Sequence, residues 1–218
     1  MPLTHESIRA LSTRDDAETL VLLRGAAASA DQFIRRTAVE VIGRHASGRT
    51  LGDVILCALA DQSEYVVRAG CQVVEDWRWD AAHDAISKLI TSPSGSTRQV
   101  SIRTLGAIWQ QTDFQPVFQI YKTAPETAVR REAAWTLRSN VSSVDWRLLF
   151  DAFRTDPLPR HRGWACDLAI AFGQPDILAF LNALCTDRDG HVRKAAAKAI
   201  AALEAHTLSA VDNVVVNV

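Results

Sequence analysis

The chain has 218 residues, of which 48% are hydrophobic and 22% charged, and its formal net charge is −1. These are ordinary values for a folded domain, and the near-zero net charge argues against a general attraction to nucleic acid or to an anionic membrane. No apolar run is long enough to cross a bilayer, and the first residues lack the apolar core of a signal peptide, so we expect a cytoplasmic protein. Arginine greatly outnumbers lysine, which fits a GC-rich bacterial genome. The cysteines have no zinc-ligand spacing and are expected to be free thiols: Cys57, Cys71, Cys166 and Cys185.

Residues 5–30 are predicted to form an N-terminal capping repeat of two helices. The segment SIRALST gives a short first helix, and DDAETLVLLRGAAAS gives a second helix with Leu20, Leu23 and Ala27 on one face.

Residues 31–206 carry a regular repeat that is marked by arginine. The arginines recur at spacings of 33, 30, 32, 32 and 31 residues: Arg35, Arg68, Arg98, Arg130, Arg162 and Arg193. The third residue after each arginine is small: Ala38, Cys71, Ser101, Ala133, Ala165 and Ala196. A fixed period of this length indicates a stacked array of helical repeats.

Each repeat contains a second helix after the arginine-bearing one. Its apolar residues follow the i, i+3, i+4, i+7 spacing of an amphipathic helix, as in the set Phe114, Val117, Phe118 and Tyr121. We name the arginine-bearing helix of a repeat the A helix and the second one the B helix. Nothing in this region alternates with period two, so no strands are predicted.

Acidic residues four places before three of the arginines, Asp31, Glu126 and Asp189, are placed to cap the A helices. The last segment, residues 207–218, is rich in β-branched residues. A partial last helix, an extended tail and disorder are all compatible with it. We treat residues 1–218 as a single repeat domain.

The phrases DGHVRKAAAKAIAAL and PETAVRREAAWTLR resemble HEAT repeats, in particular the short bacterial kind called PBS-lyase HEAT-like, over roughly residues 5–206. The resemblance implies an all-α, right-handed α-solenoid of about six helix pairs, with the B helices on the concave face. It also implies a structural role for the arginines (Arg35, Arg130 and Arg193 above all), which would bond to loop carboxylates of adjacent repeats. Repeats two and five depart from the pattern: VRAGCQVVED slips by a residue and PLPRHRGW has proline in place of the acid, so local distortion is expected there.

Catalytic patterns are missing from the sequence. The six histidines are scattered, and the zinc-protease, phosphate-loop and serine-elbow motifs are absent, so no catalytic residue, metal or cofactor is predicted. We therefore expect a non-catalytic protein-protein interaction module: an adaptor, an assembly factor or an immunity-type inhibitor. Two relatives of this repeat class are alternatives. One is a phycobilin lyase-type subunit that handles a tetrapyrrole on an acceptor protein. The other is a HEAT-like alkyl-base DNA glycosylase, to which Trp109 and Asp113 would belong, although the balanced charge disfavours DNA.

The concave face is the first candidate partner surface, for a protein or a peptide. Polar residues at positions off the apolar stripes of the B helices form it: His83, Ser87, Gln115, Gln119, Lys122, Arg147, Asp151, Arg154 and Asn182. Each residue alone would be expected on any solvated helix face. Together they could bind a peptide backbone or a polar ligand.

A convex aromatic patch is the second candidate surface. Val100, Trp135 and Trp164 fall at neighbouring positions on successive A helices. Two interpretations are equally open: the indoles are partly buried between A helices, or they are exposed and mediate homodimer formation or partner binding.

Overall fold

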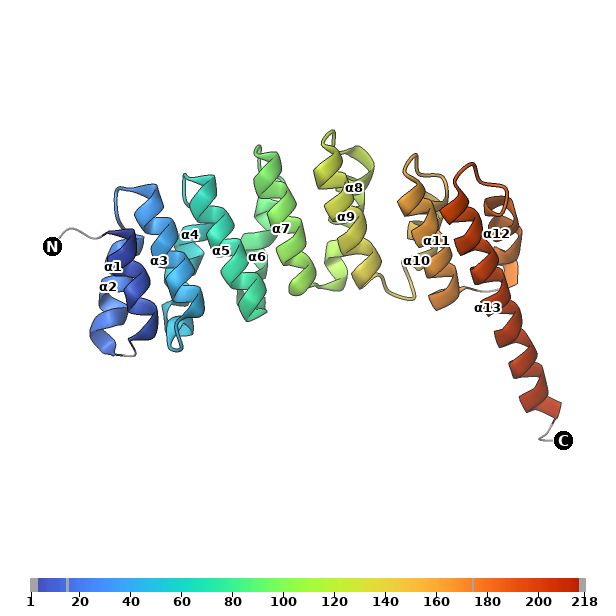
Figure 1. Ribbon diagram of the computed structural model, residues 1–218, viewed down its shortest axis with the longest axis horizontal. Coiled ribbons are helices and arrows are strands. Elements are labelled where there is room, and N and C mark those ends of the chain that lie inside the picture. The colour runs from blue at the N-terminus through green and yellow to red at the C-terminus, as the bar shows by residue number, and fades with distance from the viewer. Residues whose placement is uncertain (1–3, 15, 174, 216–218) are drawn as a thin grey trace. The chain divides into compact units, whose positions relative to one another are not determined.

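A computed structural model describes residues 4–14, 16–173 and 175–215, with the backbone alone for residues 175 and 206–215. These residues form α-helices and short 3₁₀ turns without strands (Figure 1), which confirms the all-α repeat fold. The helices are α1 (His5–Ala10), α2 (Ala17–Ala27), α3 (Gln32–Arg44), α4 (Gly52–Leu59), α5 (Glu64–Trp77), α6 (His83–Leu89), α7 (Gly95–Ala107), α8 (Phe114–Thr123), α9 (Thr127–Asn140), α10 (Trp146–Arg154), α11 (Pro159–Phe172), α12 (Leu178–Leu184) and α13 (Gly190–Val215).

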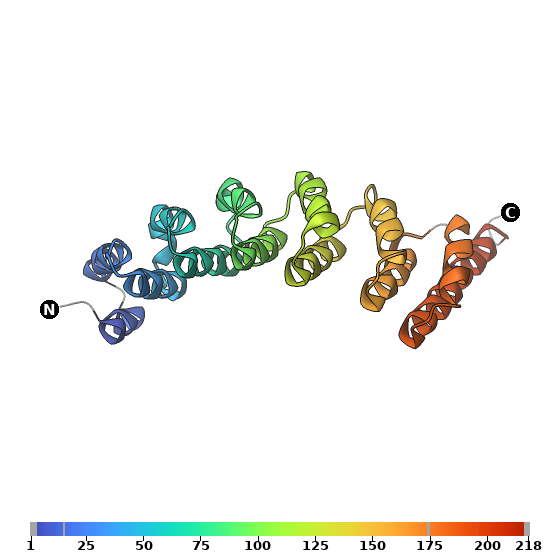
Figure 2. The ribbon, with the colours of Figure 1, turned by 90° about the horizontal axis from the view of Figure 1, so that it is seen from above.

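The chain divides into two compact units, unit 1 (Met1–Thr136) and unit 2 (Leu137–Val218), with the boundary inside α9. In unit 1 the A helices α1, α3, α5 and α7 form one layer, and the B helices α2, α4, α6 and α8 form the other (Figure 2). Neighbouring A helices pack directly on one another in both units, α3 on α5 and α7 on α5 in unit 1, and α11 on α13 in unit 2. The single repeat domain stays a prediction, as does the B-helix face as the concave one.

The predicted capping repeat corresponds to α1 and α2, and the apolar stripes of the B helices form the core. Phe114, Val117, Phe118 and Tyr121 are all buried in α8. The final A helix, α13, continues to Val215. Of the three alternatives for the last segment, residues 207–215 therefore follow the helical one. Residues 216–218 lie outside the described part.

One arginine of the sequence repeat was assigned wrongly. In α3 and α7 the arginine is the fourth residue after the N-cap, which is Asp31 for Arg35 and Ser94 for Arg98. The N-cap of α5 is Ser63, so Val67 holds the equivalent place and Arg68 comes one residue later. Because a helix turns by about 100° per residue, Val67 is buried and Arg68 is exposed.

The small residue of this repeat shifts with the register. Gly70, not Cys71, stands at the place where α5 meets α4. A Cβ atom added to Gly70 would lie 3.1 Å from Leu59 Cδ2 and 3.4 Å from Ala58 Cβ. The glycine therefore permits the close approach of the two helices of this repeat.

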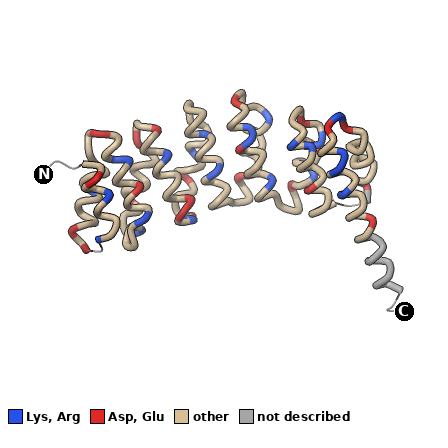
Figure 3. Tube along the Cα trace, viewed as in Figure 1, with Lys and Arg blue, Asp and Glu red and all other residues tan. Residues whose placement is uncertain are grey.

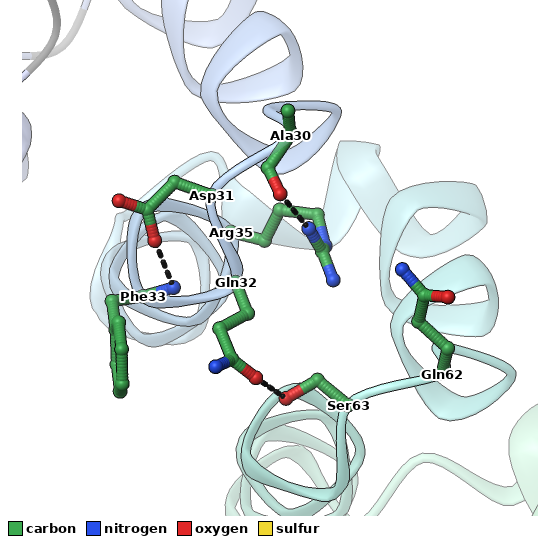
Figure 4. Close-up of a pocket in the computed structure, with 7 residues that line it drawn as sticks. All are labelled: Ala30, Asp31, Gln32, Phe33, Arg35, Gln62 and Ser63. Carbon is green, nitrogen blue, oxygen red and sulfur yellow. Dashed lines mark hydrogen bonds between the residues drawn. The ribbon is translucent and has the colours of Figure 1, made fainter.

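The arginines in correct register join the loops on both sides of their repeat. Arg35 donates from Nε and Nη2 to the two carboxylate oxygens of Asp61, both at 2.8 Å. Its Nη1 donates to the carbonyl of Ser29 at 2.9 Å and to the carbonyl of Ala30 at 3.0 Å. Figure 4 draws the bond to Ala30. The loop before α3 and the loop after α4 are thus held by one guanidinium. We name this arrangement the arginine clamp.

The clamp recurs in other repeats with the same atoms. Arg162 donates to Asp187 at 2.7 and 2.8 Å and to two carbonyls of the preceding loop at 2.9 and 3.0 Å. Arg98 bonds two carbonyls of its preceding loop and pairs with Glu126. The structural role of the arginine is therefore confirmed for Arg35. The distortion expected in repeat five is wrong at the clamp, because the acid that Arg162 needs, Asp187, comes from the following loop. The position four residues before Arg162 is the N-cap Leu158, and the proline follows it as Pro159.

Repeat two lacks both partners of the clamp. The acid position is recognisable because its side chain accepts the N–H two residues on, as Asp61 does from Ser63 at 2.8 Å and Asp187 from Asp189 at 2.8 Å. In repeat two the equivalent acceptor is Ser92, which bonds the N–H of Ser94 at 3.3 Å. Val67 stands at the arginine position and Ser92 at the acid position, so repeat two buries neither an arginine nor an acid without its partner. A buried charge without its partner would be strongly destabilising.

We expect truncation of the clamp acids to destabilise unit 1 in proportion to their burial. The side chains of Arg35 and Asp61 are 10% and 13% exposed, so Asp61→Ala leaves a buried guanidinium and should lower the free energy of unfolding by about 3 kcal/mol. Glu126 is 42% exposed, and Glu126→Ala should lower it by about 1 kcal/mol at most. Urea denaturation followed by circular dichroism measures both effects. Asp84, whose side chain is 99% exposed, supplies the control Asp84→Ala, and an equal effect of all three variants would contradict the role of the clamp.

The stabilising effect of the clamp should depend on pH. The hydrogen bonds from Arg35 hold the pKa of Asp61 below its ordinary value, and those from Arg162 do the same for Asp187. Because the folded-state pKa is lowered, the stabilisation is complete above the unfolded-state pKa of about 4 and is lost as the pH falls through the folded-state pKa. The difference in unfolding free energy between the wild type and Asp61→Asn should therefore be constant near neutral pH and shrink in acid. A difference that does not change across the acid range would refute this linkage.

Candidate protein-interaction surfaces

The B-helix face of unit 1 contains the first five predicted partner residues, and two of them lie inside the layer. His83 Nε2 is 3.0 Å from both carboxylate oxygens of Asp113, and the two side chains are 12% and 7% exposed. Asp113 also accepts the backbone N–H of Gln110 at 2.8 Å. The hydroxyl oxygen of Ser87 is buried. His83 therefore connects α6 to the turn before α8, and His83 and Ser87 contribute little to an open surface.

The other three residues of this group are exposed on α8. Gln115 and Gln119 are one helical turn apart, and their side-chain amides have no hydrogen-bond partner within the described part of the chain. Lys122 follows on the same helix, with Nζ 5.6 Å from the ring centroid of Phe118. We name Gln115, Gln119 and Lys122 the α8 stripe.

In unit 2 the predicted partner residues form a cluster around one ring. The guanidinium carbons of Arg147 and Arg154 lie 5.4 and 4.4 Å from the ring centroid of Phe180. Arg154 donates to Asp151 at 2.9 Å, and Arg147 donates to Asp176 at 2.8 Å, which raises the pKa of Arg147. Three residues of the predicted surface, Arg147, Asp151 and Arg154, therefore interact with one another, because Asp151 pairs with both arginines. Asn182, on α12, is exposed.

Arg147 and His83 occupy equivalent positions in their B segments. Each pairs with an acid that lies near the start of the next B segment, Asp176 for Arg147 and Asp113 for His83. This recurrence shows that the position connects adjacent repeats, so at these two places a structural role accounts for the polar side chain.

The residues of the predicted aromatic patch fall in both units. Trp135 belongs to unit 1 and is 51% exposed, and Val100 is half-buried. Trp164 belongs to unit 2 and is half-buried, with its ring stacked on His161 at a centroid distance of 5.1 Å and tilted against Phe153 at 6.0 Å. A patch shared by the two tryptophans stays a prediction.

Histidine, cysteine and acidic side chains are scattered over the described part of the chain. Among them, no group of three or more histidine, cysteine, aspartate or glutamate residues could hold a metal ion. Burial raises the pKa of the thiols of Cys71 and Cys166 to about 12, so neither is an activated nucleophile. Asp113, the residue that a glycosylase would use in the alternative considered above, is buried and bonded to His83.

A cavity of about 580 Å³ lies beside the clamp of Arg35 (Figure 4). Several of its polar groups are already engaged: Asp31 accepts the N–H of Phe33 at 2.8 Å, and Ser63 donates to Gln32 at 2.6 Å. Arg35 is fully bonded in the clamp as well, whereas Gln62 lines the cavity with an exposed amide.

Two sets of residues were not predicted from the sequence. Two clamp acids, Asp61 and Asp187, directly follow a small or hydroxyl residue at the end of a B segment, and this spacing could have supplied a signal for them. Exposed arginines on the A helices of unit 1 were also missed: Arg36, Arg44, Arg68 and Arg103.

Comparisons with known proteins agree with this architecture. Residues 147–214 match the family model of HEAT repeats. A comparison with curated protein sequences gives no match. The archaeal HEAT-like repeats protein from Thermococcus onnurineus NA1 has a similar structure, with 16% sequence identity, a TM-score of 0.55 and coverage of 94% of this chain and 98% of that one.

Two further solved structures are similar over most of their length. A designed armadillo repeat protein in complex with the peptide (KR)4 has 16% identity and a TM-score of 0.59, with 84% of this chain and 98% of that one covered. The complex of CpcE and CpcF of phycocyanin lyase from Nostoc sp. PCC7120 gives 18% identity and a TM-score of 0.48, with 93% and 96% covered. The fold is that of a helical repeat solenoid of the HEAT and armadillo type. None of the described helices is both long and apolar enough to span a membrane.

The two tryptophans should respond differently to substitution. Trp135→Glu replaces an exposed indole and should change the free energy of unfolding by about 0.5 kcal/mol or less. Trp164→Glu removes the stack on His161 and Phe153 and should cost about 3 kcal/mol. Denaturant unfolding of each single variant distinguishes them, and equal losses would show that Trp135 is also part of the core.

Proposed function

We propose that this protein is a non-catalytic protein-interaction module that binds an extended segment of a partner protein along its B-helix face, as an adaptor, an assembly factor or an immunity-type inhibitor in the bacterial cytoplasm. The observation that carries the proposal is the pair of exposed, unpartnered amides Gln115 and Gln119 on α8. The surfaces of stacked repeats are commonly used in this way, because each repeat extends the surface of its neighbour without a break.

The chemistry of the α8 stripe suits a peptide backbone. An extended peptide exposes N–H and C=O groups, and side chains on one side of it recur about every 6.7 Å. Gln115 and Gln119 are four residues apart, a rise of about 6 Å along the helix, and their flexible side chains can span the difference. Each amide both donates and accepts, so both can pair with one backbone. The designed armadillo relative, solved with the peptide (KR)4, supports such a use of the fold.

The partner can be identified by co-purification from the native host followed by mass spectrometry. The variant Gln115→Ala/Gln119→Ala should then weaken binding of that partner about tenfold, which corresponds to about 1.4 kcal/mol for two hydrogen bonds. Gln62→Ala, a change of an exposed amide outside the stripe, is the matched control. Unchanged affinity of the α8 variant would refute binding through this stripe.

Reversal of Arg147 and Arg154 is a less informative test. Both arginines contact the ring of Phe180 and pair with acids of unit 2. Reversal of their charges would therefore disturb the fold of that unit as well as the binding of any partner. A visible absorbance from a bilin bound to the purified protein would instead support the lyase-type alternative.

A further inference from the structure

We propose that the A-helix face of unit 1 is a second interaction surface, which binds an acidic peptide segment of a partner protein in a groove over α3, α5 and α7. The groove has a volume of about 370 Å³. Four arginines and a single carboxylate residue are among its lining residues: Arg36, Arg44, Arg68, Arg103 and Glu40. Basic positions occur on each of the three helices (Figure 3).

Two of the four arginines are already neutralised by their neighbours. Arg36 donates to Glu40 at 2.7 Å. Arg103 donates to Glu75 at 3.0 Å and to Gln72 at 3.2 Å. These pairs fix the rims of the groove and leave little charge for a ligand.

The other two arginines of the groove are not held in ion pairs with described residues. Arg44 and Arg68 are exposed, and neither makes a hydrogen bond or an ion pair with the described residues. The nearest acid to Arg68 in the sequence is Glu64, which accepts hydrogen bonds from the hydroxyls of Ser94 and Ser96, at 2.7 and 2.6 Å. Those two bonds and the charge of Arg68 lower the pKa of Glu64, but the Glu64 carboxylate forms no hydrogen bond with Arg68 in the described part of the chain. An exposed guanidinium with its donors unused is suited to a carboxylate, which it can bind through two parallel hydrogen bonds.

Arg68 reaches this surface because of the register slip in α5. An arginine in register at residue 67 would point into the clamp, whereas Arg68 lies about 100° further around the helix. Repeat two therefore has no clamp and has a surface arginine instead. The departure from the repeat pattern coincides with the groove.

An aromatic pair borders the same arginines. Phe33 and Tyr65 are 46% and 44% exposed, and their ring centroids are 6.0 Å apart. Tyr65 also lines the groove. Exposed tyrosine and arginine side chains are enriched among the residues that dominate binding energy at protein interfaces.

The composition of the groove favours a peptide over nucleic acid. Ala69 and Val100 give it an apolar part, and Glu40 lies among the arginines. A nucleic-acid surface needs a continuous basic track for several phosphates, and among the described residues of this groove only two arginines are outside ion pairs. A short acidic peptide with an apolar or aromatic residue matches the charge and the apolar part together.

The test uses a fluorescein-labelled octaglutamate peptide and fluorescence anisotropy at low salt, with the full chain. Saturable binding is expected, and Arg44→Glu/Arg68→Glu should weaken it at least about tenfold. Both residues are exposed, so circular dichroism should show an unchanged fold. The double variant Lys88→Glu/Arg160→Glu makes the same change in net charge outside the groove and should retain binding.

The opposing outcomes are distinct. Absence of saturable binding, or equal weakening in both double variants, overturns the proposal. Tighter binding of a single-stranded oligonucleotide that is lost in the Arg44/Arg68 variant would assign the groove to nucleic acid instead of a peptide. The Gln115→Ala/Gln119→Ala variant should bind octaglutamate normally, so failure at the A-helix face is distinguishable from failure at the B-helix face.

Discussion

The arginine clamp is the interaction on which the arrangement of the repeats depends. In a stacked array each repeat contacts only its neighbours, so the loops between repeats must be fixed locally. One guanidinium has five donors in a rigid plane, enough to hold two carbonyls of one loop and a carboxylate of the next. Arg35 and Arg162 use this capacity in the same way, although they belong to different units. The clamp therefore determines how one helix pair continues into the next.

Much of this fold was predictable because its signals are periodic and local. The recurring arginine and the B-helix stripes identified the helix pairs, and Asp31 and Asp189 cap α3 and α13 as their positions indicate. The prediction was wrong for Arg68, because spacings of 33 and 30 residues on its two sides differ by only one residue from the 32 and 31 that the in-register residue Val67 gives. In a helix, one residue of slip moves a side chain from the interior to the surface. Only the N-cap at Ser63 reveals it.

The candidate surfaces were less predictable than the fold, for a physical reason. A position off the apolar stripe is polar both when it meets solvent and when it pairs with an acid of the next repeat. His83 and Arg147 belong to the second class, through Asp113 and Asp176. The acids that pair with them are about one repeat away in the sequence. The residues next to His83 and Arg147 in the sequence therefore do not indicate that these ion pairs form. Gln115, in the same position of its own repeat, is the member that stays exposed.

Repeat two shows how one part of the array can give up a structural interaction without loss of order. Its A helix, α5, has no clamp at its start, but it is fixed at its end. Trp77 donates from Nε1 to the carbonyl of Gly43 at 3.0 Å, and Arg49 both bonds the carbonyl of Trp77 and lies 5.5 Å from the centroid of its ring. These bonds hold α5 to the preceding repeat from the other end. The register slip places residue 68 on the A-helix face, and these contacts keep α5 attached to the preceding repeat although the clamp is missing. Natural proteins commonly break a local rule where a function requires it and compensate nearby, and α5 fits that description.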